Sequence, residues 1–171
     1  GDAGGAPPPD AGTEPGGSVI PPATLPLTVT QLQARFKLGG SRDQCAISGI
    51  IPNLSAQFTP TGQTMILNVG GAVLNVTLDS RGRGRTSSGS VILKFKARAR
   101  APFAGGDVPF TAVMKGAWAQ TWLDQSAIMD ADAQSQPVEW DVSLHFNGNT
   151  YSATIGAFNT SRQGKGGIVK K

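Results

Sequence analysis

A single histidine, His145, is the one side chain of this sequence whose ordinary pKa lies near neutral pH. A serine hydrolase needs such a base beside a nucleophile and a carboxylate. His145 instead lies in an alternating segment next to Asn147-Gly148, where an exposed or hydrogen-bonded histidine is the usual finding. The sequence has no nucleophile elbow, phosphate-binding loop, dinucleotide-binding fingerprint or zinc-type set of cysteines and histidines. It therefore predicts no enzyme, no catalytic residue and no cofactor.

Carboxylates gather in one stretch of the chain, and paired carboxylates serve glycosidases and calcium sites. They are Asp124, Asp130, Asp132, Glu139 and Asp141. A glycosidase also needs a cleft lined with aromatic rings, but aromatic residues make up only 6% of the chain. Asp130-Ala131-Asp132 offers alternate oxygen ligands without the glycine and distal glutamate of a calcium-binding loop. No metal site is predicted, although cation binding by Asp130 and Asp132 stays open.

Three arginines, Arg81, Arg83 and Arg85, alternate with glycine. Such a run could follow a phosphate backbone, and it is similar to segments that bind RNA. However, the run falls where a hairpin needs a turn, and it has no interleaved aromatic rings for base stacking. A solvated turn is the first interpretation, contact with a polysaccharide or another anionic surface is the second, and nucleic acid comes last.

Charge is unevenly distributed along the chain, although the net charge is only +4. Residues 35–100 contain ten bases and two acids, whereas residues 101–161 contain six acids and one base. Such a chain could fold into a body with a basic and an acidic face, and identical molecules could then meet with opposite potentials. Ordinary solvated strand surfaces are the alternative.

The remaining sequence predicts short strands joined by tight turns. Alternating apolar residues mark strands at 27–38, 44–51, 64–69, 72–78, 90–98, 108–115, 138–146 and 150–158, with a bulge near Gln31. Gly70-Gly71 and Asn147-Gly148 are expected to close two hairpins. Tryptophans at helical spacing within residues 117–131 indicate one or two short helices that cap an end of the fold.

The two hairpins align at a spacing of 77 residues, which suggests an internal repeat. Leu67-Asn68-Val69-Gly70-Gly71 aligns with Leu144-His145-Phe146-Asn147-Gly148. We therefore expect an all-β fold, a two-sheet β-sandwich, Ig-like or jelly-roll-like, of about eight strands. The sandwich would be a single domain over residues 27–171, with related halves at about 27–100 and 101–171.

Residues 1–26 are rich in glycine and proline and cannot bury enough apolar surface to fold alone. We expect an extended segment long enough to reach a neighbouring molecule. Cys45, the single cysteine, lies in an alternating segment and is expected in the core. A single cysteine fits a protein that avoids free thiols and is secreted, extracellular or on a cell surface. No apolar run is long enough to span a membrane.

Two classes of function remain. The first is a structural subunit of a filament, pilus-like fibre or surface layer. Its extended segment would dock on the next subunit through the contact residues Val19, Ile20, Leu25, Leu27 and Val29. The second is a monomeric adhesin or carbohydrate-binding module that uses loops and an exposed tryptophan.

Overall fold

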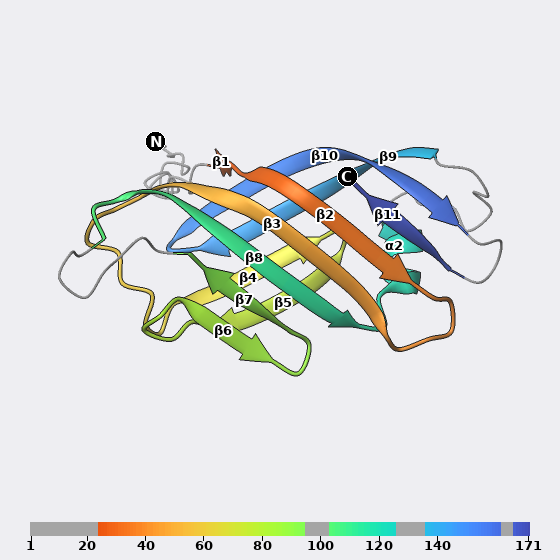
Figure 1. Ribbon diagram of the computed structural model, residues 1–171, viewed down its shortest axis with the longest axis horizontal. Coiled ribbons are helices and arrows are strands. Elements are labelled where there is room, and N and C mark those ends of the chain that lie inside the picture. The colour runs from red at the N-terminus through yellow and green to blue at the C-terminus, as the bar shows by residue number, and fades with distance from the viewer. Residues whose placement is uncertain (1–23, 95–102, 126–135, 162–165) are drawn as a thin grey trace, which may run out of the picture.

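The protein is almost entirely β-structure. The computed structural model describes residues 24–94, 103–125, 136–161 and 166–171 (Figure 1). Its elements are β1 (Thr24–Pro26), β2 (Thr28–Phe36), β3 (Asp43–Leu54), β4 (Thr64–Val69), β5 (Ala72–Thr77), β6 (Arg83–Thr86), β7 (Gly89–Leu93), β8 (Gly106–Gly116), α2 (Ala119–Gln125), β9 (Gln136–Phe146), β10 (Asn149–Ser161) and β11 (Gly167–Lys170). In the described part of the chain, no helix combines the length and hydrophobicity that crossing a bilayer requires.

All eleven strands belong to one hydrogen-bonded sheet with the order β5-β4-β9-β10-β11-β2-β3-β8-β7-β6, and β1 pairs with β10. The sheet curls so that its two end strands, β5 and β6, come together. There the amide of Asp79 donates to the carbonyl oxygen of Arg83 at 2.8 Å. The all-β class is confirmed. Two separate sheets and an Ig-like topology are not seen in the described residues. The sequence could not predict the strand order, because alternation shows which face of a strand is buried and not which strand lies beside it.

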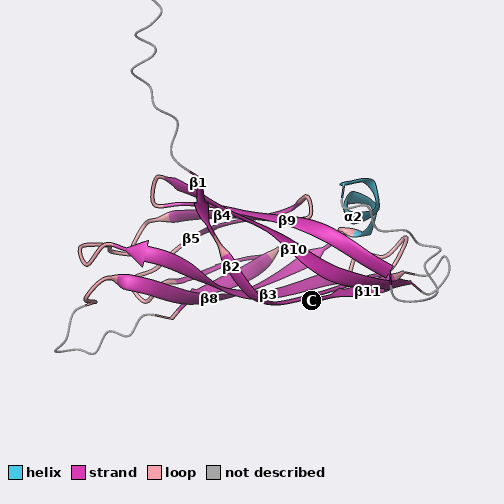
Figure 2. Cartoon of the chain, turned by 90° about the horizontal axis from the view of Figure 1, so that it is seen from above, coloured by secondary structure: helices cyan, strands magenta, loops and turns pink. Residues whose placement is uncertain are grey.

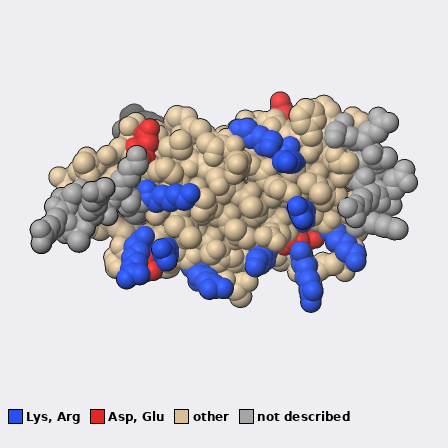
Figure 3. Space-filling model, in the orientation of Figure 1, with Lys and Arg blue, Asp and Glu red and all other residues tan. Residues whose placement is uncertain are grey.

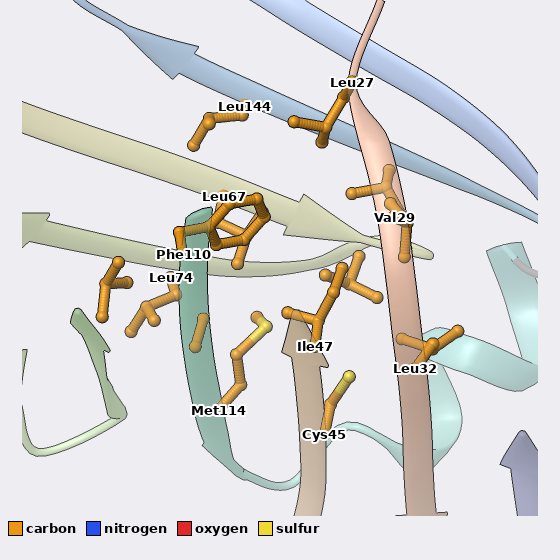
Figure 4. Close-up of a cluster of buried hydrophobic side chains, with 14 of the residues drawn as sticks. Leu27, Val29, Leu32, Cys45, Ile47, Leu67, Leu74, Phe110, Met114 and Leu144 are labelled. Atoms are coloured by element: carbon orange, nitrogen blue, oxygen red, sulfur yellow. The ribbon is translucent and has the colours of Figure 1, made fainter. Parts of the chain in front are cut away.

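Seen from above, the curled sheet is flattened into two layers (Figure 2). We call β2, β3, β6, β7, β8 and β11 the front layer, because they face the viewer in Figure 1, and β4, β5, β9 and β10 the back layer. Side chains from both layers meet in one core, in which Leu67 and Leu144 lie opposite Ile47 and Met114 (Figure 4). The alternating residues thus fill a single interior.

The predicted bulge is present, since the pairing of β2 with β3 shifts between Val29 and Gln31. Opposite it lies Gly49, where an added Cβ would come within 2.3 Å of the carbonyl oxygen of Thr28 and 2.8 Å of the ring of Phe110. Both are closer than atoms tolerate. The absence of a side chain at this inward position therefore leaves the space that the Phe110 ring occupies in the core.

Both predicted hairpin turns are confirmed. Gly70 and Gly71 have φ angles of 60° and 101°, and Asn147 and Gly148 have φ angles of 52° and 74°. Two successive positive φ angles are what a type I′ turn requires, and its twist matches that of the flanking strands. The turns are 77 positions apart, and the strands that they join, β4–β5 and β9–β10, occupy corresponding places on the two sides of the β4–β9 pair.

One of the predicted short helices is described, α2, and it packs against one end of the core. Trp122 is fully buried there, 5.4 Å from the ring of Trp140, and its indole N–H donates to the carbonyl oxygen of Val69 at 3.1 Å. The buried carboxylate of Asp43 accepts the amides of Trp118 and Ala119, each at 2.8 Å. Because Asp43 begins β3, it ties the helix to the front layer.

Asp43 also accepts the amide of Lys37 at 2.7 Å, so one carboxylate joins three segments of chain. Cys45, two residues on, is buried as predicted, and burial raises the pKa of its thiol to about 12. Three strands were not predicted, β1, β6 and β11.

Candidate anion-binding face

The Arg/Gly run is a strand edge rather than only a turn, which corrects the first sequence-based interpretation. Arg83 and Arg85 point outward on β6 and are exposed, whereas Gly84 points inward and is buried. An added Cβ at Gly84 would lie 2.8 Å from Cγ2 of Val76 on β5. Glycine therefore lets the sheet close on itself, while the arginines alternate to the outside.

A carboxylate fixes the turn that leads into this strand. Oδ1 of Asp79 accepts the backbone amides of Arg81 at 2.8 Å and Arg83 at 3.0 Å. These two hydrogen bonds hold the pKa of the Asp79 carboxyl below its ordinary value. The bonds are to main-chain N–H groups, so the guanidinium groups of the two arginines stay outside them.

The sheet register places further bases beside the predicted three. One row of outward positions crosses the front layer through Arg85, Ser90, Val113, Ala46, Gln33 and Lys170. The next row passes through Lys115, Gln44, Arg35 and Ile168. No aspartate or glutamate stands in either row. The front layer therefore brings together bases from segments far apart in the sequence.

Three adjoining hollows follow these bases across the layer. The first, of about 470 Å³, is lined by Phe58, Pro60, Ser80, Arg81, Arg83, Ile92, Leu93, Lys94 and Phe103. The second, of about 520 Å³, is lined by Gln44, Arg83, Gly84, Arg85, Thr86, Ser87, Gly89, Ser90, Val91, Ile92, Val113 and Lys115. The third, of about 220 Å³, is lined by Gln33, Arg35, Gln44 and Ala46.

Neighbouring hollows share lining residues. Arg83 and Ile92 belong to the first and second, and Gln44 belongs to the second and third. Together they form what we call the basic groove, whose charged lining residues are Arg35, Arg81, Arg83, Arg85, Lys94 and Lys115. From β6 to β2 the groove crosses four strand spacings, roughly 19 Å.

The space-filling view shows the same distribution. Lys and Arg side chains run along the lower half of the front face, over β6 and the ends of β8, β3 and β2, with few acids among them (Figure 3). The four back-layer strands contain no Lys or Arg and carry Glu139 and Asp141. The unequal charge along the sequence thus becomes a difference between two layers.

Three of the five predicted subunit contacts are described, Leu25, Leu27 and Val29, and none of these three lines the basic groove. Leu27 and Val29 are buried in the core of their own chain, and Leu25 is partly buried against it. Val19 and Ile20 lie outside the described residues. The short strand β1, which includes Leu25, pairs in parallel with Thr150–Ser152 of the same chain.

The other candidate side chains show no built site. Nδ1 of His145 lies 3.1 Å from the hydroxyl oxygen of Thr150, and both side chains are in an exposed hollow. Asp130 and Asp132 lie outside the described residues, and within those residues no cluster of three or more potential metal ligands occurs.

The tryptophans are not available as an exposed platform. Trp122 and Trp140 have 0% of their surface exposed, and Trp118 is partly buried against the core. The exposed tryptophan that a carbohydrate-binding module was expected to use is therefore not found in the described part of the chain.

Comparison of the chain with family models, with curated proteins and with solved structures finds no significant match. The function must therefore be inferred from the basic groove itself. Lys115, Arg35 and Gln44 were missed as members of this site. The alternation of polar and apolar residues in the sequence could have shown that these three side chains point outward from their strands. Only the strand order, however, shows that they lie near Arg83 and Arg85.

Proposed function

We propose that this protein is a non-catalytic binding module that holds an acidic polysaccharide in the basic groove. The observation that carries the proposal is the run of six bases along three connected hollows with no carboxylate in their lining. The Asp79 carboxylate is close enough to Arg81 and Arg83 to interact with their charges, but the other four bases have no carboxylate beside them in the lining of the hollows. Like charges brought together destabilise a surface unless a partner neutralises them. An anionic chain laid across the strands would do so at several points at once.

The form of the groove favours a polymer over a small anion. Its bases are spread over about 19 Å, so no single small ligand reaches all of them. The long side chains come from a flat strand surface and can contact successive acidic groups along a chain. Binding of this kind weakens steeply with salt.

The groove is poorly suited to nucleic acid. Stacking platforms for bases are exposed aromatic rings, and the aromatic residues of the groove are Phe58, which is buried, and Phe103, which is partly buried. Polar lining residues such as Gln44 and Ser90 instead offer hydrogen bonds to sugar hydroxyl groups.

The test is calorimetric titration with dextran sulfate and polygalacturonate, with neutral dextran as the ligand control. The double variant Arg85→Gln/Lys115→Gln is expected to lower the affinity for both acidic polymers at least about tenfold. Arg42→Gln removes one exposed base in the 39–42 loop, outside the groove, and is expected to change the affinity less than twofold. Equal losses in both variants, or equal binding of neutral dextran, would contradict the proposal.

Assembly into a filament or surface layer is the second candidate, supported by the contrast between the two layers. The back layer presents Glu139 and Asp141 and no base, so the front layer of one copy complements the back layer of the next. Such stacking is head to tail and leaves Leu27 and Val29 in their own core. Both candidates fit a secreted or cell-surface protein.

Sedimentation velocity at low and moderate salt separates the two candidates. Stacking predicts large species at low salt that disappear in Glu139→Lys/Asp141→Lys, a variant that leaves the groove intact. A monomer of 17.6 kDa at all salt concentrations would exclude stacking and leave the proposal of polysaccharide binding unaffected.

A further inference from the structure

An aromatic side chain is exposed where the C-terminal half of β10 joins the front layer. Phe158 has 57% of its surface exposed, more than any other large apolar side chain of the described residues. It lies directly opposite Lys170 on β11, and β11 lies between β10 and β2 (Figure 1). A single exposed apolar residue is ordinary on a protein surface. The neighbours of Phe158 therefore decide whether its ring has a role.

The register of the sheet connects Phe158 with the basic groove. Residues directly opposite each other in neighbouring strands lie on the same face. The outward row that includes Arg85 and Lys170 therefore continues to Phe158, and beyond it, on β9, comes Pro137. Phe158 is two strand spacings, roughly 10 Å along the sheet, beyond Gln33 in the lining of the third hollow. The ring thus lies at the end of the groove.

A glycine in the same strand leaves space beside the ring. Gly156 is two residues from Phe158, so it belongs to the same outward face of β10. In the described part of the chain, an added Cβ at Gly156 would meet no atom within 4 Å, and its backbone is outside the left-handed region. Neither packing nor conformation therefore requires glycine here, although glycine weakens the interior of a strand. Such a glycine is typical of a place where a ligand approaches the strand closely.

The charges around the ring indicate what could bind there. Lys170 is exposed, and its neighbours in the row are Phe158 and Gln33, neither of which carries a charge. Glu139 lies on the other side of β10, directly opposite Gly156. An anionic chain is therefore attracted as far as Lys170 and repelled at Glu139. The ring lies between these two charges, where an acidic polymer in the groove would end.

We propose that Phe158 and Lys170 form a terminal subsite of the basic groove, in which one acidic sugar ring stacks on Phe158 while Lys170 binds its acidic group. The inference rests on the polysaccharide binding proposed above. One face of a galacturonate ring presents C–H groups, which pack on the electron-rich face of an aromatic ring. The Cβ atoms of directly opposite residues are about 5 Å apart, so one sugar residue reaches both side chains. The subsite thus distinguishes an acidic sugar from an anion that has no ring.

The isolation of the ring favours a sugar over a nucleic acid. Single-stranded nucleic acids are held by several aromatic rings, on which successive bases stack. Within the described residues, Phe158 is the one Phe, Tyr or Trp side chain that is exposed. One ring at the end of a row of bases suits one stacked sugar residue.

The test is calorimetric titration of the full chain with polygalacturonate and with inorganic polyphosphate, a polyanion without sugar rings. Phe158→Ala is expected to lower the affinity for polygalacturonate at least about fivefold and the affinity for polyphosphate less than about twofold. The matched control Phe158→Tyr keeps the ring and should bind polygalacturonate as the native chain does. Because the side chain is exposed, the urea midpoint of Phe158→Ala should equal that of the native chain, which checks that the fold is intact.

A second measurement does not depend on a loss of affinity. Phe158→Trp places an exposed indole in the subsite, whereas Trp122 and Trp140 are fully buried. Polygalacturonate should shift the fluorescence emission of this variant to shorter wavelength, because a stacked sugar removes the indole from water. Polyphosphate should leave the emission unchanged, as should polygalacturonate added to the native chain.

An affinity for polygalacturonate that is unchanged in Phe158→Ala, or is reduced equally for polyphosphate, would overturn the subsite and leave the groove as proposed. A larger loss for oligothymidylate than for polygalacturonate would also overturn it, because the ring would then stack on a base. If the native chain does not bind polygalacturonate at all, the proposed function and the subsite both fail. The two failures are therefore distinguishable.

Discussion

The two layers of the molecule are alike inside and different outside. Both contribute alternating apolar side chains to one core, so their inner surfaces obey the same packing rule. Outside, the front layer carries the basic groove and the back layer carries no Lys or Arg. Packing of the core does not require that surface charges be separated between the two layers. The separation of charge is therefore an argument for a binding partner, as proposed above, and not for a contribution to stability.

The largest expected effect comes from breaking what the layers share. Leu144 of the back layer is fully buried, and Leu144→Ala should destabilise the protein by about 3 kcal/mol through lost contacts and a residual cavity. Urea denaturation followed by tryptophan fluorescence and by far-UV circular dichroism measures this loss. Both probes should shift together, because one core serves both layers; separate transitions would show two independent units.

A smaller loss is expected at the connection between the front layer and α2. Asp43→Ala removes the acceptor of three backbone amides and should cost about 2 kcal/mol. Asp43→Asn, which keeps the shape and one acceptor oxygen, should cost less. Thermal unfolding monitored by tryptophan fluorescence distinguishes the two variants; equal stability of Asp43→Ala and the native protein would show that the helix is held by Trp122 alone.

The difference in surface charge between the two layers can be tested through the salt dependence of polysaccharide binding. If Lys115 contacts the polymer, Lys115→Gln should lower the slope of log affinity against log salt by roughly 1. The back-layer variant Glu139→Gln, with the opposite change in charge, should leave the slope unchanged. The measurement is a dextran sulfate titration at several salt concentrations. An equal change of slope in both variants would mean that net charge, and not the groove, governs binding.

The smallest expected effect is at the turn that orients the arginines. The pKa of the Asp79 carboxyl is lower in the folded protein than in the unfolded chain. Its contribution to stability is therefore present above the unfolded pKa of about 3.9 and is lost as the pH falls through the lower folded value. Urea midpoints between about pH 4.5 and 2 should fall less steeply in Asp79→Asn than in the native protein, and identical pH profiles would show that the carboxylate does not stabilise the turn.

Local structure was predictable where one residue type decides it. The paired turn residues at Gly70-Gly71 and Asn147-Gly148 marked both hairpins, and alternation marked eight strands within a few residues. β6 was missed because Arg alternating with Gly has the composition of a loop, although its period of two is that of a strand. The groove was only half predicted, since nothing local to Lys115 or Arg35 reveals that β8 and β2 lie on the two sides of β3.

The pairing of β11 with β2 has a consequence for how the protein folds during synthesis. β11 pairs with β2, and Gly167 lies opposite Phe36, so one of the last strands of the chain completes the surface begun by one of the first. Contacts between such distant segments form slowly, because the entropy of closing the intervening loop must be overcome first. During synthesis, one edge of β2 therefore stays unpaired until β11 has emerged from the ribosome. Until then β3 is the one neighbouring strand of the sheet with which β2 can form backbone hydrogen bonds.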